Sequence, residues 1–111
     1  MDVKIENLPE VMFVRLSGEI DHHNARQIRE QVDSAVEMHK PKKLCLDFKD
    51  VTFMDSSGIG MIIGRYKKLH NIGGKIGVIN ISPKIKRIFE MSGLFNIVSC
   101  FNDEKEAADK L

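Results

Sequence analysis

The sequence contains no long run of apolar residues. Its longest apolar runs, 11–14 and 59–63, are far shorter than the roughly 20 residues that a membrane-spanning helix needs. Residues 1–10 alternate charged with apolar residues and lack the continuous apolar stretch of a signal peptide. We therefore expect a cytosolic protein without a membrane partner.

The chain also lacks an excess of charge of either sign. Seventeen Lys and Arg residues face sixteen Asp and Glu residues, which gives a formal net charge of +1. A chain this close to neutrality has no strong field to attract nucleic acid or an anionic membrane. The balance favours protein or small-molecule partners and argues against nucleic acid.

Cysteine is scarce, because only Cys45 and Cys100 are present. Each lies within an apolar run, and neither has a second Cys or a His at the spacing of a metal site. We expect two buried, reduced thiols and no bound metal.

No repeat, low-complexity tract or proline-rich linker divides the chain. Its 111 residues, 42% of them hydrophobic, suit one packed core. We therefore expect residues 1–111 to form a single domain.

The spacing of apolar residues predicts alternating strands and helices. A two-residue period predicts a strand, and steps of three and four residues predict a helix. On this basis the predicted strands are 3–6, 11–17, 44–49, 75–81 and 96–101, and the predicted helices are 25–39, 59–69, 83–89 and 103–111.

This order of elements predicts an α/β fold with a mostly parallel sheet of about five strands. The first two strands are close enough for a hairpin, so the first strand is expected to be antiparallel. Arg15, Asp47 and Lys49 interrupt strands that would otherwise be apolar. Because strands covered on both faces are continuously apolar, we expect helices mainly on one face and a partly hydrated second face.

The carboxyl edge of a parallel sheet is where ligands usually bind, and the loops expected there are 18–24, 50–58 and 80–84. The middle loop holds Asp55, Ser56, Ser57 and Gly58 immediately before a predicted helix. These residues suit a helix cap. They also suit an exposed phosphoryl acceptor, since unpaired N–H groups and the helix dipole favour an added dianion. The two interpretations are compatible.

Two other functions remain open for this loop. Gly58, Gly60 and Gly64 resemble a dinucleotide fingerprint but miss its spacing by one residue, and no G-K-[ST] follows, so close packing of the helix on the sheet is the simpler role of Gly60 and Gly64. A serine hydrolase would use Ser57 with His22 or His23 as base, but the G-x-S-x-G elbow is missing.

Several segments resemble the STAS domain of anti-sigma factor antagonists over essentially the whole chain. They are FMDSSGIG at 53–60, GRYK at 64–67, LSGEIDHH at 16–23, ISP at 81–83 and MSGLF at 91–95. The resemblance implies a STAS-like fold. It further implies that Ser57 is phosphorylated by an anti-sigma factor that is itself a serine kinase, and that Asp21 contacts this partner.

The resemblance also implies a cycle. The unphosphorylated protein binds the anti-sigma factor and frees the sigma factor, phosphorylation ends the binding, and a serine phosphatase restores it. We therefore expect a phosphoprotein that regulates transcription, with no catalysis and no cofactor of its own. The expected partner surface consists of Asp21, Asp55, Ser56, Ser57, Gly58 and Met61.

Overall fold

Five strands form one sheet whose spatial order is the same as their order in the chain. The structure is a computed structural model that describes all of residues 1–111. The strands are β1 (Asp2–Asn7), β2 (Met12–Ile20), β3 (Lys43–Met54), β4 (Lys75–Ile79) and β5 (Ser99–Phe101). The helices are α1 (His22–His39), α2 (Ser56–Asn71), α3 (Pro83–Ser92) and α4 (Glu104–Lys110), with a 3-10 turn at Leu94–Asn96.

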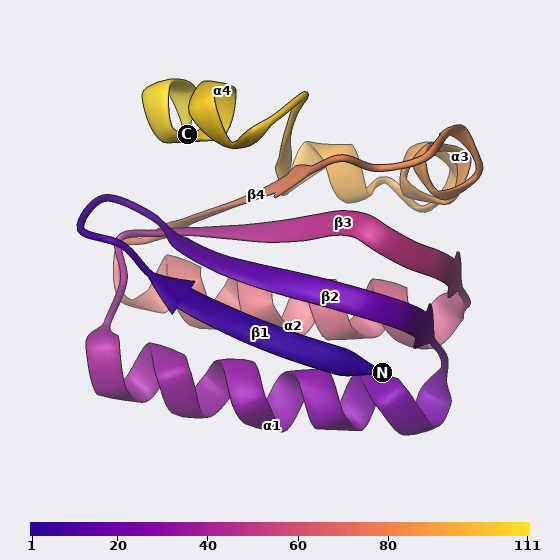
Figure 1. The fold of residues 1–111 in the computed structure, drawn as a ribbon, viewed down its shortest axis with the longest axis horizontal. Helices are drawn as coiled ribbons and strands as arrows, with labels where there is room; N and C mark the ends of the chain where they lie inside the picture. Colours follow the sequence, from indigo (N-terminus) through magenta and orange to yellow (C-terminus); the bar gives the residue numbers. More distant parts are fainter.

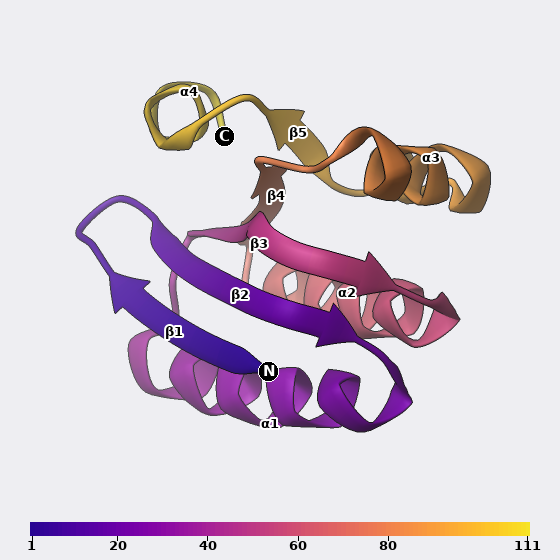
Figure 2. The same ribbon diagram turned by 45° about the vertical axis from the view of Figure 1, so that its right-hand side comes forward.

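The pairing of the strands confirms the predicted α/β topology. β1 is antiparallel to β2, and every other neighbouring pair is parallel. Figures 1 and 2 show α1 and α2 side by side beneath the sheet and α4 on the opposite side. None of the four helices combines the length and the apolar character needed to cross a membrane.

The alternation of side chains along the strands divides the interior into two clusters. On β3, Leu44, Leu46 and Phe48 belong to a cluster of 22 buried residues that also takes in residues of α1, α2 and α3. Cys45, between Leu44 and Leu46, points to the other face and joins a cluster of six. Three of the four helices thus pack on one face, as predicted.

α4 covers part of the second face. The smaller cluster contains Ala107 of this helix and Leu111, which directly follows it. Beside it, Arg15 Nη1 donates to Asp47 Oδ2 at 2.9 Å, and the same guanidinium pairs with Glu6 and with Glu104 of α4. Polar residues do occupy this face, but Asp47 is only 6% exposed, and its carboxylate accepts hydrogen bonds from Arg15, from the amide of Lys49 and from Asn80.

Several predicted boundaries were wrong. β2 and β3 continue to Ile20 and Met54, so 18–20 and 50–54 are strand and not loop. The reason is tertiary, because these ends pair with each other. At the other end of the chain, β5 is limited to three residues, since the backbone at 94–98 forms a 3-10 turn closed by hydrogen bonds to Leu94 O. Cys100, on this short edge strand, is exposed, which corrects the expectation of a buried thiol.

Candidate functional site

Two helices begin side by side at the carboxyl edge of the sheet. Ile20 and Met54 are paired at the ends of β2 and β3, and the residue after each one is an aspartate. The amide of Asp55 donates to Ile20 O at 3.1 Å, which ties the two turns together. The fold therefore places Asp21 close to the 55–58 segment, as the sequence predicted.

Both aspartates cap helices. Asp21 accepts a hydrogen bond from the amide of Asn24 at 2.8 Å, and Asp55 Oδ1 accepts one from the amide of Ser57 at 2.8 Å. A carboxylate at this position also interacts favourably with the positive end of the helix dipole. The structure confirms that Asp55 caps α2. It also shows that Asp21 caps α1.

The four residues of the 55–58 segment differ in their surroundings. Ser56 is exposed, whereas Ser57 is half-buried and faces a groove between α1 and α2. Gly58 is buried, and a Cβ placed there would lie 2.4 Å from Met54 Cγ. Glycine at 58 thus lets α2 start directly against the ends of β2 and β3, which brings Ser57 to the groove.

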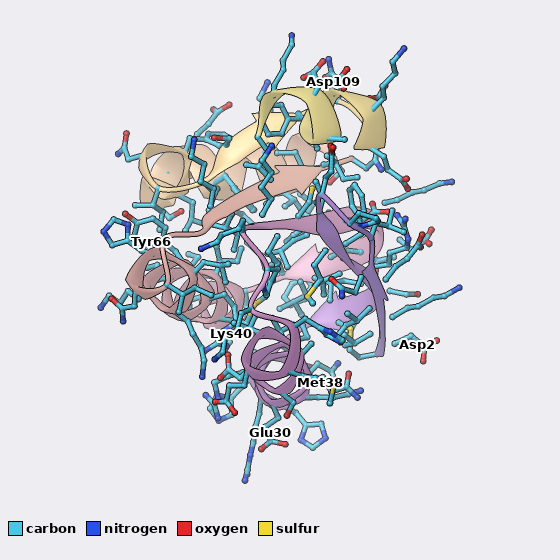
Figure 3. All side chains as sticks on the ribbon, turned by 90° about the vertical axis from the view of Figure 1, so that its left-hand side faces the viewer. Asp2, Glu30, Met38, Lys40, Tyr66 and Asp109 are labelled. Carbon is cyan, nitrogen blue, oxygen red and sulfur yellow. The ribbon has the colours of Figure 1, made fainter.

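We call this depression the α1–α2 groove; it is open and about 820 Å³ in volume. It is lined by His22, His23, Ala25, Arg26, Arg29 and Glu30 of α1 and by Ser57, Gly60, Met61, Gly64 and Arg65 of α2. Figure 3 looks nearly along both helices and shows Glu30 projecting from α1 away from the sheet. Three arginines and one carboxylate line the groove, so its lining carries net positive charge, although Arg26 pairs with Glu30 and Arg65 pairs with Asp33 of α1.

Gly60 and Gly64 do not pack α2 on the sheet, which corrects the prediction. A Cβ at either position would meet no atom within 4 Å, and both glycines line the α1–α2 groove. They lie three and seven residues after Ser57, a spacing that places all three on one face of a helix. Because residues 60 and 64 have no side chains, the groove is bounded on its α2 side by backbone at these two positions and stays open there.

Arg65 joins the two helices and was not singled out in the sequence. Its Nε lies 2.9 Å from Asp33 Oδ1 of α1, and the residue is only 6% exposed. Burial lowers the pKa of Arg65, and the nearby carboxylate of Asp33 only partly offsets this. Its position eight residues after Ser57 fits the helical repeat of three and four residues, and this spacing was a signal that the sequence could have supplied.

Met61 is mostly a core residue. It is 5% exposed and packs in the larger cluster, so only a small part of it reaches the groove. Of the six residues predicted to form the partner surface, Ser57 and Met61 line the groove, Asp21 and Asp55 cap the helices beside it, Ser56 is exposed next to it and Gly58 is buried beneath it.

The groove also brings Ser57 close to the two histidines that a hydrolase would need. The hydrogen bond that involves Ser57 uses its backbone amide, however, and not its hydroxyl. No group of three or more His, Cys, Asp or Glu side chains lies close enough together to hold a metal ion. Chemically, the groove presents the Ser57 hydroxyl, which can accept a phosphoryl group, beside positively charged arginine side chains.

Comparison with known proteins assigns the fold. Residues 2–107 match the STAS domain. The chain belongs to the STAS domain family. An anti-sigma F factor antagonist of Paenibacillus polymyxa is 39% identical over 111 residues, which cover all of this chain and 95% of that protein. An anti-sigma-B factor antagonist of Bacillus subtilis is 35% identical over 85 residues, or 77% of this chain and 76% of the relative.

Solved structures support the same family. The structure of the anti-sigma factor antagonist SpoIIAA in its unphosphorylated form matches with a TM-score of 0.85 and 32% identity, covering 98% of this chain and 95% of that one. SpoIIAA of Bacillus in its phosphorylated form matches with a TM-score of 0.76 and 33% identity, covering 98% of both chains. These STAS relatives are named for a regulatory binding function, and their similarity extends over the whole sheet and the helices that cover it.

Proposed function

We propose that this STAS protein is an anti-sigma factor antagonist whose binding is switched off by phosphorylation of Ser57. The unphosphorylated form binds an anti-sigma factor that is a serine kinase and so frees the sigma factor in the cytoplasm. A serine phosphatase reverses the modification. Residues 1–111 act as one domain with no catalysis of their own.

The observation that carries this proposal is the placement of Ser57. It is half-buried at the start of α2, where the cationic α1–α2 groove begins, and its amide is already held by Asp55. A serine in this position has a defined orientation and neighbours that favour an added dianion. The relative solved in both an unphosphorylated and a phosphorylated form supports a phosphate switch in this family.

Energetics favour a switch that acts on binding and not on folding. A phosphate adds about −1.5 to −2 charges, and at a helix start this changes local energy by only about 0.3–2 kcal/mol. A small domain is stable by about 5–15 kcal/mol, so the fold persists. A desolvated, unpaired charge at an interface costs several kcal/mol, and each 1.4 kcal/mol is a tenfold change in affinity. We therefore expect phosphorylation to weaken partner binding by about 100- to 1000-fold.

The first experiment is intact mass analysis with peptide mapping, after the protein is mixed with ATP and the anti-sigma factor from the same organism. We expect one added phosphate on Ser57, retained in Ser56→Ala and lost in Ser57→Ala. No addition, or addition at Ser56, would contradict the proposal.

Binding to the same anti-sigma factor then tests the switch. Ser57→Ala is expected to bind like the wild type, and Ser57→Asp to bind weakly because it places a carboxylate at the groove. Ser92→Asp, which adds the same charge at an exposed position of α3, is the matched control and should bind normally. Equal affinity of Ser57→Ala and Ser57→Asp would refute the switch.

A further inference from the structure

Three buried residues line the α1–α2 groove, and one of them is charged. Ala25 of α1 and Met61 of α2 are apolar and belong to the larger core cluster, whereas Arg65 of α2 carries a positive charge. Apolar contacts have no preferred direction, so they permit small shifts of one helix along the other. The contacts of Arg65 therefore matter most for where α1 lies against α2.

Arg65 points across to α1 and meets Asp33 there. Its Nε lies 2.9 Å from Asp33 Oδ1, but the geometry does not form a hydrogen bond, and both of these atoms are buried without a hydrogen-bond partner. Taking two charges out of water costs free energy that their attraction offsets only when the geometry is good and the remaining donors are bonded. We therefore expect this pair to add little to the stability of the fold.

The same pair strongly disfavours a change in the relative position of the two helices. If α1 shifted along α2, the charges of Asp33 and Arg65 would separate, and each would be left buried without a partner. Breaking a buried pair is costly even where the intact pair adds little net stability. The pair thus fixes the register of α1 against α2.

Little else fixes this register along the part of α2 that borders the groove. A Cβ at Gly60 or Gly64 would meet no atom within 4 Å, so neither position interlocks with α1. The starts of the two helices are joined by the hydrogen bond from the Asp55 amide to Ile20 O. Arg65 is ten residues after Asp55, which is roughly 15 Å at the rise of an α-helix. The groove therefore lies between two fixed points, one at the helix starts and one at its far end.

We propose that Asp33 and Arg65 are positioning residues for the proposed Ser57 switch, and that their pair holds α1 and α2 in the register at which the anti-sigma factor binds. They act through the groove-lining residues of both helices and do not themselves contact the partner. This inference rests on the proposed function, because binding of that partner is what the register serves.

Replacing the whole pair with apolar residues tests the proposal. The double variant Asp33→Leu with Arg65→Met removes both charges together, so its midpoint of urea unfolding should equal or exceed that of the wild type. Its affinity for the anti-sigma factor should nevertheless fall by about 10-fold or more. In the phosphorylation reaction the KM for this protein should rise by a similar factor while kcat stays within about 2-fold, because Asp55 still holds the Ser57 amide.

A second double variant, Glu37→Leu with Lys68→Met, is the matched control. It removes another ion pair between α1 and α2, at 3.1 Å, whose side chains are more exposed and do not line the groove. Lys68 also lies 3.9 Å from Asp33, but that carboxylate keeps Arg65 in the control. Exposed pairs add little, so affinity and KM should stay within about 2-fold of the wild type. Equal loss in both double variants would overturn the assignment to Asp33 and Arg65.

The single variant Arg65→Met separates positioning from stability. It leaves Asp33 without its cation and should lower both the urea midpoint and the affinity. Adding Asp33→Leu should then restore the midpoint but not the affinity, whereas a purely structural role would restore both.

The remaining outcomes distinguish this inference from the proposed function. Wild-type affinity in the apolar double variant, or a loss of its stability that accounts for the loss of affinity, would overturn the inference. With Ser57→Asp still blocked, the proposed function would stand. A wild-type protein that binds no anti-sigma factor would remove both.

Discussion

Ser56 and Ser57 are neighbours in the first turn of α2, yet their surroundings differ. Ser56 is exposed to solvent beside the cap, while Ser57 has its amide bonded to Asp55 and faces the α1–α2 groove. At this scale the difference comes from the helix itself, because successive residues point about 100° apart around its axis. One hydroxyl therefore belongs to the candidate switch and the other does not.

The two aspartate caps hold the candidate site in place, and Asp55 is the more informative to change. Asp55→Ala removes the acceptor for the Ser57 amide and is expected to lower the free energy of unfolding by about 1 kcal/mol, measured by urea denaturation. Asp55→Asn keeps an oxygen acceptor and should retain most of the stability. An equal loss in both variants would show that the carboxylate charge, and not the cap bond, is what stabilises this turn.

The two thiols are expected to react very differently. Burial raises the pKa of the Cys45 thiol to about 12 and also raises the pKa of the Cys100 thiol, but Cys100 is exposed at the edge strand whereas Cys45 is buried. Iodoacetamide at about pH 8 should therefore label Cys100 in the folded protein and leave Cys45 unmodified until urea is added, as read by mass spectrometry. Because the unfolded thiol ionises first, the stability due to Cys45 is complete below about pH 9 and is lost as the pH rises toward 12. Rapid labelling of Cys45 in the native protein would contradict this.

At the scale of elements, α2 packs in different ways along its length. Its start presses Gly58 against Met54 and Ile20, its middle leaves Gly60 and Gly64 beside the groove, and Arg65 then pairs with Asp33 of α1. The helix thus packs against the core on one side and lines the groove on another. Gly58 allows close packing, whereas Gly60 and Gly64 leave the groove open.

Alanine at these glycines should therefore shift stability in opposite directions. Gly64→Ala meets no atom and restricts the unfolded chain, so it should raise the free energy of unfolding by about 0.5–1 kcal/mol. Gly58→Ala would place its Cβ against Met54 and should lower it by about 1–3 kcal/mol. Urea denaturation of the two variants measures both changes, and a loss at 64 would mean that this part of α2 packs more tightly than the structure shows.

At the scale of the whole molecule, Arg15 connects segments far apart in the chain. From β2 it bonds Glu6 of β1, Asp47 of β3 and Glu104 of α4. Partial burial by itself would lower the pKa of Arg15, but the hydrogen bonds to these three carboxylates outweigh it and raise the pKa above its ordinary value. These ion pairs of Arg15 hold α4 against the face of the sheet opposite the groove.

Removing this cation should loosen α4 and weaken the fold. Arg15→Met leaves the buried Asp47 without its cation and is expected to lower the free energy of unfolding by about 1–3 kcal/mol, with faster amide exchange in α4. Lys4→Met is the matched control, because Lys4 is the exposed register partner of Arg15 and forms no ion pair. Equal effects of the two substitutions would show that stability falls because a positive charge is removed and not because the ion pairs of Arg15 are broken.

The local features of this protein were readable from its sequence. The order of strands and helices, the antiparallel first pair, the grouping of helices mainly on one face and a helix cap within residues 55–58 all follow from apolar periodicity and from residues adjacent in the chain. The motifs around Ser57 also indicated the family that the comparisons established. These signals are local, so no knowledge of the packed structure was needed.

Tertiary packing alone decided the rest. The extension of β3 to Met54 depends on pairing with β2, and the exposure of Cys100 depends on β5 being a short edge strand. Likewise, the α1–α2 groove exists because Asp33 and Arg65, which are 32 residues apart, meet between helices whose starts are joined by the Ile20–Asp55 hydrogen bond. Such contacts depend on how the helices and strands pack together, and a pattern within one element carries no information about its neighbour across the sheet.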